Sequence, residues 1–248
     1  GVPVVDLIVP ARNEAANVPA LFDALHAADA RPRLRRIVVA DNGSTDATAD
    51  LARQRGAEVV HESTPGYGGA CLAAIAHLAD DPPEAVAFLD ADLSDDPAAL
   101  AGLIEAVCVQ GFDLAVGSRV ALAEAGALEP HQRFGNALAC RLIALATGRR
   151  FRDLAPMRVV RFDALRRLDM RDRTWGWIVE MNYKAATHGL RVVERDVPYR
   201  RRHAGVSKIS GSLQGSWRAG TKILSTIYLL WRAERQAAAR QAKHARNA

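Results

Sequence analysis

The sequence predicts an α/β protein built on a mostly parallel β-sheet with helices on both faces. Five short apolar segments rich in β-branched residues alternate with four segments in which apolar residues recur every three or four positions. This alternation is typical of a parallel sheet that is covered on both sides. With 248 residues, 49% of them hydrophobic, the chain is long enough to bury one large core of this kind.

These nine segments occupy the first half of the chain. Ligands of parallel sheets bind beyond the carboxyl ends of the strands, so the loops that follow the strands are the candidates for chemistry. We expect strands at residues 4–9, 36–41, 57–61, 85–90 and 113–118, and helices between them at residues 18–28, 46–55, 67–78 and 97–109.

The second half of the chain is less regular. Residues 131–147 and 178–188 have helical periodicity, residues 158–162 and 190–198 resemble strands, and a final helix is expected from Ser212 into the tail. No linker divides the chain. Residues 1–232 are therefore expected to form one domain, followed by a basic tail at residues 233–248.

The net charge of +5 suits an anionic small substrate, an anionic membrane surface or nucleic acid. The basic tail carries no aromatic residue after Trp231, which argues against a nucleic-acid partner. The three cysteines are an odd count and widely spaced, as in proteins of a reducing compartment. Without a secretory signal or an apolar run long enough to cross a bilayer, we expect a cytoplasmic protein.

Two carboxylates, Asp90 and Asp92, follow the apolar segment at residues 86–89. In a strand, residues two apart point to the same side, so both carboxylates could address one cation. Hard cations such as Mg²⁺ or Mn²⁺ prefer oxygen ligands and also accept phosphate oxygens, which would stabilise a departing diphosphate. The pattern is common by itself, and the nearby Asp95 and Asp96 are expected to cap the next helix.

The loop DNGSTD at residues 41–46 has two interpretations. Gly43 permits a tight turn, and the hydroxyl and carboxyl groups after it can cap the following helix, so the loop could be a structural turn without a ligand. Asp41 is left unexplained by that interpretation. It could accept hydrogen bonds from a nucleobase at the end of its strand.

Four motifs together resemble glycosyltransferase family 2, and within it the branch of dolichol-phosphate mannose synthases and polyprenyl-phosphate glycosyltransferases. They are VPARNE at residues 9–14, DNGSTD at 41–46, DADLS at 90–94 and GSR at 117–119. The resemblance extends over residues 4–230. It implies the GT-A fold, a Rossmann-like sheet with an acceptor-side extension of strands and helices at its C-terminal end, in which residues 1–120 bind the nucleotide sugar and residues 121–232 the acceptor.

The resemblance also implies roles for individual residues. The nucleotide would be bound by Pro10, Arg12, Glu14 and Asp41, and the metal by Asp90, Asp92 and Ser94, with Ala91 beside the donor. Arg119 would lie near the donor phosphates or sugar, and Arg133 near an acceptor phosphate. Arg202 and Lys208 would close over the diphosphate. Asp92, Arg119 and Lys208 are thus expected to take part directly in catalysis.

The implied reaction is a Mg²⁺- or Mn²⁺-dependent, inverting transfer of a hexose from a UDP- or GDP-sugar to a polyprenyl phosphate. Two departures keep a soluble hydroxyl acceptor open: the branch usually has Gly-Phe-Arg where this chain has Pro156-Met157-Arg158, and its frequent C-terminal membrane spans are missing. A nucleotidyltransferase is the alternative from another class. It would carry a glycine-rich basic loop after the first strand, and PARNE at residues 10–14 is not such a loop.

Three further features have open interpretations. Glu180 could be a catalytic base, an anchor for a sugar hydroxyl, or a structural partner of an arginine. Trp175 and Trp177 could stack on a sugar or pack at a helix start. The glycine cluster GYGGA at residues 66–70 lacks the lysine of a phosphate-binding loop, so it is expected to let a helix approach the sheet closely.

The final helix carries an apolar stripe with basic residues beside it. Such a helix can lie on an anionic membrane, which would place the protein at the inner face of the plasma membrane. It can equally pack on the sheet or against a second copy of the chain. The stripe comprises Leu213, Trp217, Ile223, Leu224, Ile227 and Leu230, with Arg218 and Lys222 beside it.

Overall fold

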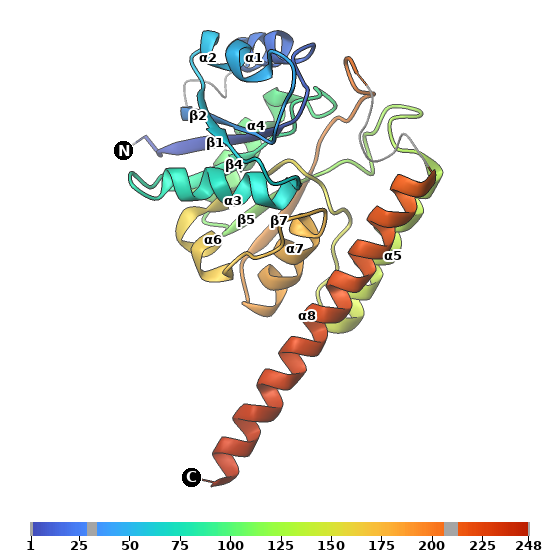
Figure 1. Cartoon of the computed structure of the whole chain (residues 1–248). Helices are drawn as coiled ribbons and strands as arrows, with labels where there is room; N and C mark the ends of the chain where they lie inside the picture. Colours follow the sequence, from blue (N-terminus) through green and yellow to red (C-terminus); the bar gives the residue numbers. More distant parts are fainter. Residues whose placement is uncertain (1, 29–33, 206–212, 248) are drawn as a thin grey trace.

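The structure, a computed structural model, describes residues 2–28, 34–205 and 213–247. Its centre is a seven-stranded sheet with the strand order β3-β2-β1-β4-β6-β5-β7 (Figure 1). The strands are β1 (Val5–Ala11), β2 (Leu34–Asp41), β3 (Glu58–His61), β4 (Ala85–Phe88), β5 (Leu114–Ser118), β6 (Arg158–Arg161) and β7 (Val192–Asp196).

Helices connect these strands and cover both faces of the sheet. A short 3-10 helix, η2 (Pro97–Ala99), precedes α4. The α-helices are α1 (Val18–Ala27), α2 (Thr48–Gln54), α3 (Tyr67–Leu78), α4 (Leu100–Cys108), α5 (Pro130–Thr147), α6 (Phe162–Leu168), α7 (Trp177–Thr187) and α8 (Leu213–Asn247).

The sheet is mostly parallel, as predicted. Strand β6 runs antiparallel to both of its neighbours, β4 and β5, whereas the other pairings are parallel. Strands β1, β2, β4 and β5 consequently end at the same edge. The loops that follow them, which carry the four sequence motifs, therefore meet there.

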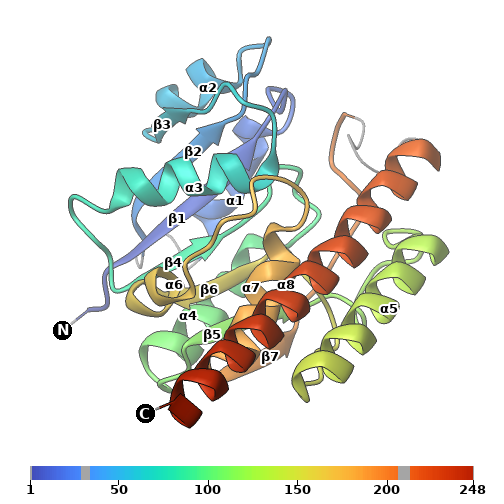
Figure 2. The same ribbon diagram turned by 60° about the horizontal axis from the view of Figure 1, so that its bottom comes forward.

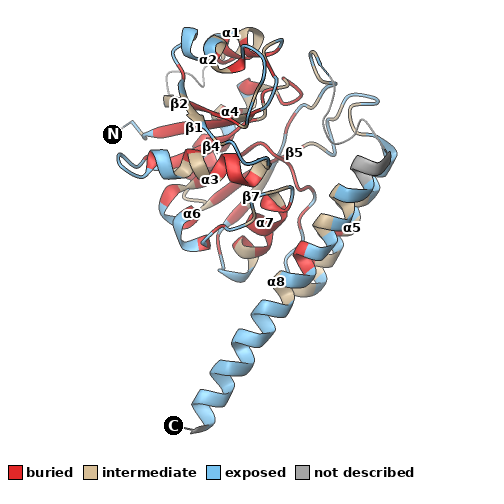
Figure 3. Ribbon diagram, viewed as in Figure 1, coloured by how far each residue is buried: buried red, intermediate tan, exposed pale blue. Residues whose placement is uncertain are grey.

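The core lies on both faces of the sheet, because successive strand residues point to opposite sides. In β1, Leu7 packs in the layer that contains α1 and α4, and Ile8 packs in the layer that contains α3, α6 and α7. Both side chains are fully buried. Figures 2 and 3 show these layers and the burial of the strands between them.

The structure differs from the sequence prediction around Phe162. The expected strand at 158–162 ends at Arg161, and a helix, α6, that the sequence did not predict begins at once. Its buried residues Phe162, Leu165 and Leu168 are spaced by three, so a helical signal was present. The helix has only seven residues and ends at Asp169 in the left-handed conformation, which made its pattern too short to recognise.

Helices α5 and α8 pack against each other beside the sheet (Figure 1). Helix α8 continues without a break beyond residue 232, so the basic tail is the second half of this helix. From Arg232 onward its described side chains are exposed, and this half extends away from the rest of the molecule (Figure 3). Among the described helices, none combines the length and the apolar character needed to cross a bilayer.

Candidate active site

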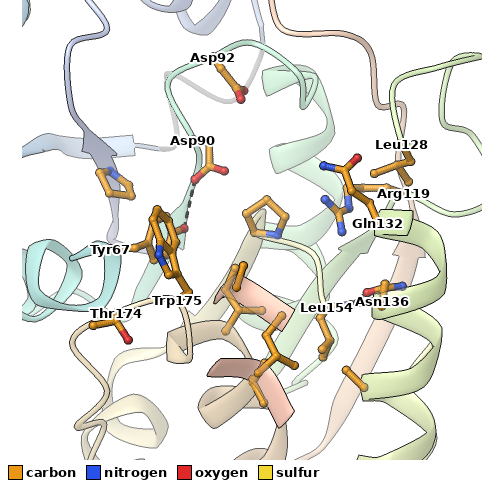
Figure 4. Close-up of a pocket in the computed structure, with 18 of the residues that line it drawn as sticks. Tyr67, Asp90, Asp92, Arg119, Leu128, Gln132, Asn136, Leu154, Thr174 and Trp175 are labelled. Atoms are coloured by element: carbon orange, nitrogen blue, oxygen red, sulfur yellow. Dashed lines mark hydrogen bonds between the residues drawn. The ribbon is translucent and has the colours of Figure 1, made fainter. Parts of the chain in front are cut away.

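A cavity of about 940 Å³ lies at the carboxyl edge of the sheet. This volume is within the range of small-molecule sites in proteins. One end is polar and is formed by the loops after β1, β4 and β5 together with the start of α5, which contributes His131, Gln132 and Arg133. The other end is mainly apolar and is formed by α7, α8 and the following turn of α5. Figure 4 shows Asp90 and Asp92 above the cavity and Arg119 and Gln132 across it.

The loops after β1 and β2 are joined to each other. The Asn13 amide donates to Ser44 Oγ over 2.9 Å, and Asn13 Oδ1 accepts from the Thr45 amide over 2.8 Å. Asn13 adopts a left-handed backbone conformation, which asparagine tolerates better than most residues. The connection presents Pro10, Arg12 and Glu14 to the cavity. Their predicted role in binding a nucleotide stays a prediction.

Asp90 and Asp92 both line the cavity, but they reach it by a different geometry from the one predicted. Strand β4 ends at Phe88, so the two carboxylates lie in a turn that includes Leu93 with a left-handed φ of 62°. Asp92 Oδ1 accepts a 3.0 Å hydrogen bond from the Ser94 amide. Burial and the neighbouring Asp92 carboxylate raise the pKa of Asp90 to about 7.

This pair of carboxylates fits a divalent cation. It offers hard oxygen ligands, and a cation would offset both causes of the raised Asp90 pKa, which are burial of the carboxylate and, second, repulsion from Asp92. No cluster of three histidine, cysteine or acidic side chains suited to a metal occurs in the part of the chain that the structure describes. The remaining coordination positions would therefore fall to phosphate oxygens and water. Ser94, expected as a further ligand, does not line the cavity.

Arg202 reaches the same end of the cavity from far along the chain. Its guanidinium donates to both carboxylate oxygens of Glu14 over 2.9 Å, and Nη2 lies 3.8 Å from Asp92 Oδ2. Asn17 reinforces the contact by donating to Glu14 and to the Ala204 carbonyl. The structure thus brings Glu14, Asp92 and Arg202 together, while Lys208 lies outside the described residues.

Arg119 lines the cavity and is held by Asp153, a residue for which no separate role was predicted. The fully buried Asp153 carboxylate accepts from the Arg119 amide and from Nε and Nη2 of its guanidinium, over 2.8–2.9 Å. The guanidinium also lies 5.0 Å from the centre of the Tyr199 ring. Arg133, at the beginning of α5, lines the cavity as well.

Asp41 does not line the cavity that Glu14, Asp92, Arg119 and Arg202 share. Its carboxylate lines a second, smaller hollow, where it accepts from the Ser44 amide and lies 3.1 Å from His61 Nδ1. Asn42 lines the main cavity instead. Its side chain bonds to the Gly66 amide and to carbonyls of the segment after β3, so it links β2 to the start of α3.

Glu180 also lies outside the cavity lining. Its buried carboxylate accepts from the amides of Arg171 and Asp172 and lies 2.9 Å from Lys184 Nζ. These contacts are those of a structural residue, which is one of the alternatives that the sequence left open for Glu180. The two tryptophans differ in their surroundings. Trp177 is buried at the start of α7, whereas Trp175 lines the cavity.

Comparisons with known proteins found a matching family and several relatives. The sequence model of the family described as glycosyl transferase family 2 matches residues 6–169. An uncharacterised glycosyltransferase of Mycobacterium tuberculosis is 40% identical over 86% of this chain and 92% of its own length. The undecaprenyl-phosphate mannosyltransferase of Micrococcus luteus is 32% identical over 84% of this chain and 88% of its own length.

The fold has solved counterparts. Glucosyl-3-phosphoglycerate synthase from Mycobacterium tuberculosis, solved with Mn²⁺, UDP and glucosyl-3-phosphoglycerate, superposes with a TM-score of 0.67. The match covers 91% of this chain and 80% of that one at 19% identity. At this identity the similarity concerns the fold, and it confirms the architecture that the motifs predicted.

Proposed function

We propose that this chain, which belongs to glycosyltransferase family 2, transfers a hexose from a UDP- or GDP-sugar to a polyprenyl phosphate with inversion at the anomeric carbon. It is a glycosyltransferase of the polyprenyl-phosphate branch, and the name of the Micrococcus luteus relative supports the acceptor. The observation that carries the proposal is the division of one cavity into a polar and an apolar end.

The polar end suits the donor. Mg²⁺ or Mn²⁺ held by Asp90 and Asp92 would neutralise charge on the nucleoside diphosphate as it leaves. Arg202 adds a fixed positive charge beside Asp92, and its bidentate bond to Glu14 keeps the guanidinium in place without a ligand. Arg12 and Pro10 line the neighbouring wall, where the nucleotide would lie. As predicted from the sequence, Lys208 would supply a second positive charge that closes over the diphosphate.

The apolar end suits an isoprenoid chain. Small side chains leave space between the three helices that form it, and among the described side chains of α7 and α8 no charged residue lines it. Arg133 lies at the α5 side, where it could bind the acceptor phosphate. The lining residues of this end include Ala137, Ala139, Ile178, Ala219, Gly220 and Ile223.

A phosphate acceptor also agrees with the position of Glu180. A hydroxyl acceptor must lose a proton as it attacks, whereas a phosphate is already ionised at neutral pH and needs no base. The described lining of the cavity has no carboxylate besides Glu14, Asp90 and Asp92. Glu14 is held by Arg202, and the other two are assigned to the metal.

The test is to incubate the purified chain with labelled UDP- or GDP-hexoses, Mn²⁺ and vesicles that contain undecaprenyl phosphate. We expect label to pass into the organic phase as an acid-labile product, and chelation of the metal to abolish the transfer. Label that enters only water-soluble products when 3-phosphoglycerate or another soluble acceptor is supplied would contradict the lipid acceptor and support the soluble one.

We also propose that α8 rests on an anionic membrane surface, so that the protein is peripheral to the inner face of the plasma membrane. Trp217, Leu224 and Tyr228 are exposed and share one face of the helix by their spacing of seven and four. Arg218, Arg232 and Arg235 are also exposed along this helix. Apolar residues between basic ones match the interface of an anionic bilayer.

Flotation with phosphatidylglycerol vesicles tests this contact. Trp217→Ser together with Tyr228→Ser is expected to lower binding by roughly tenfold or more, because each apolar side chain contributes about 1.5–3 kcal/mol when buried. Val109→Ser is the matched control, since Val109 is an exposed apolar residue on the other side of the sheet. Equal binding of both variants and the parent would refute the contact.

A further inference from the structure

We infer that Tyr67 is a positioning residue for Asp90. Tyr67 and Trp175 together form a part of the cavity wall that holds the Asp90 carboxylate in its orientation. The inference rests on the proposed function, in which Asp90 holds the metal ion. It assigns a purpose to two features that the proposed reaction leaves unused, the glycine cluster at residues 66–70 and the exposed Trp175.

The direct contact is between two side chains of the cavity. The Tyr67 hydroxyl donates to Asp90 Oδ1 over 3.1 Å (Figure 4). Within the described part of the chain, no other side chain hydrogen-bonds to Asp90, whereas Asp92 is held by the Ser94 amide and lies near Arg202. A single donor on Oδ1 fixes the orientation of the carboxylate and leaves Oδ2 for a cation.

Tyr67 is itself held by Trp175. The two rings are stacked, with centroids 6.4 Å apart and planes inclined by 29° (Figure 4). Offset stacking of this kind restricts a tyrosine ring that would otherwise rotate at the edge of a cavity. Both residues line the cavity, so the pair forms part of its surface rather than part of the core.

The glycines bring these two residues together. The Gly69 amide donates to the Arg173 carbonyl over 2.8 Å, and the Gly68 amide donates to the Thr174 carbonyl over 3.3 Å. A Cβ at position 68 would lie 2.0 Å from the Asp172 carbonyl oxygen, so only glycine permits this approach. The glycine cluster therefore fastens the segment before α7 to the start of α3.

The same segment, residues 171–175, is fastened at two other points. Glu180 on α7 accepts from the amides of Arg171 and Asp172, and Asp172 Oδ2 lies 3.1 Å from Lys222 Nζ on α8. Three helices therefore fix Trp175, which fixes Tyr67, which orients Asp90. Glu180 contributes to the site through this chain of contacts, although it lies outside the cavity.

Calorimetric titration of Mn²⁺ into the protein with bound UDP or GDP tests the inference. Tyr67→Phe keeps the ring and its stacking and removes only the hydroxyl. We expect Mn²⁺ affinity to fall by about 10- to 100-fold, the usual effect of removing a hydrogen-bond partner of a metal ligand. Tyr183→Phe is the matched control, because it removes a hydroxyl that bonds to Glu234 over 2.7 Å, away from the cavity. Its Mn²⁺ affinity should equal that of the parent.

A double variant separates positioning from a general loss of structure. In the Asp90→Ala background, Tyr67→Phe should have no further effect on Mn²⁺ affinity, because the carboxylate that accepts from the Tyr67 hydroxyl is absent. Equal Mn²⁺ affinity of the parent and Tyr67→Phe, or a loss of the same size in the Asp90→Ala background, would overturn the inference. A parent that binds no Mn²⁺ with either nucleotide would instead refute the proposed function.

Discussion

Asp92→Ala is expected to lower kcat/KM by roughly 10²-fold or more. Asp92 lines the cavity, its Oδ2 lies 3.8 Å from Arg202, and the proposed metal ion would lie between it and the diphosphate. Loss of one preorganised group that stabilises the leaving group typically costs about 10²–10³-fold in rate. Initial rates of hexose transfer at saturating Mn²⁺ measure the effect.

Asp96→Ala is the matched control for this experiment. Asp96 lies four residues further along the same loop, where its Oδ1 accepts a 3.0 Å hydrogen bond from the Ala98 amide and caps η2. Loss of the cap is expected to cost about 1 kcal/mol of stability and to leave the rate of transfer unchanged. Near-parental rates in Asp92→Ala would remove the metal hypothesis.

Asp153→Ala is expected to reduce the free energy of unfolding by about 3–5 kcal/mol. The substitution leaves the guanidinium of Arg119, which is only 14% exposed, without its fully buried carboxylate partner, and breaking a buried pair at one partner is strongly destabilising. It also releases Arg119 from its position beside the cavity, so activity should fall as well. Urea-induced unfolding, followed by circular dichroism, measures the loss of stability.

Two comparison variants decide whether the Asp153 effect comes from the buried pair. Asp196→Ala removes an exposed carboxylate 2.9 Å from Arg152, and an exposed pair of this kind contributes about 0–1 kcal/mol. Replacing the buried pair as a whole, with Asp153→Leu and Arg119→Met, should recover part of the stability while the enzyme stays inactive. Equal losses in Asp153→Ala and Asp196→Ala would contradict the assignment.

The sequence predicted the sheet and its functional edge because both follow from short-range patterns. The alternation of apolar segments predicted the parallel strands, and the parallel direction brought the loops after β1, β2, β4 and β5 to one edge. Glu14, Asp92 and Arg202 meet there although nearly two hundred residues separate the first from the last. Their roles in binding and catalysis stay predictions.

The sequence could not predict how side chains turn at that edge. Asp41 and Glu180 have the chemistry of site residues, yet Asp41 turns toward His61, and Glu180 toward backbone amides before its own helix. Asp153 and Tyr67 matter through partners 34 and 23 residues away in the chain. Such contacts depend on how the folded segments pack, and no local pattern encodes them.

The antiparallel strand β6 has a consequence for the width and variability of the site. Because β6 separates β4 from β5, the ends that carry Asp90 and Arg119 are two interstrand spacings apart, roughly 10 Å. Its reversed direction means that β6 starts where its neighbours finish, so Leu154 and Pro156 form a floor across that gap. Leu154 and Pro156 precede β6 and take no part in its pairing with β4 and β5, so substitutions in this floor can change the shape of the cavity while the hydrogen bonds of the sheet stay the same.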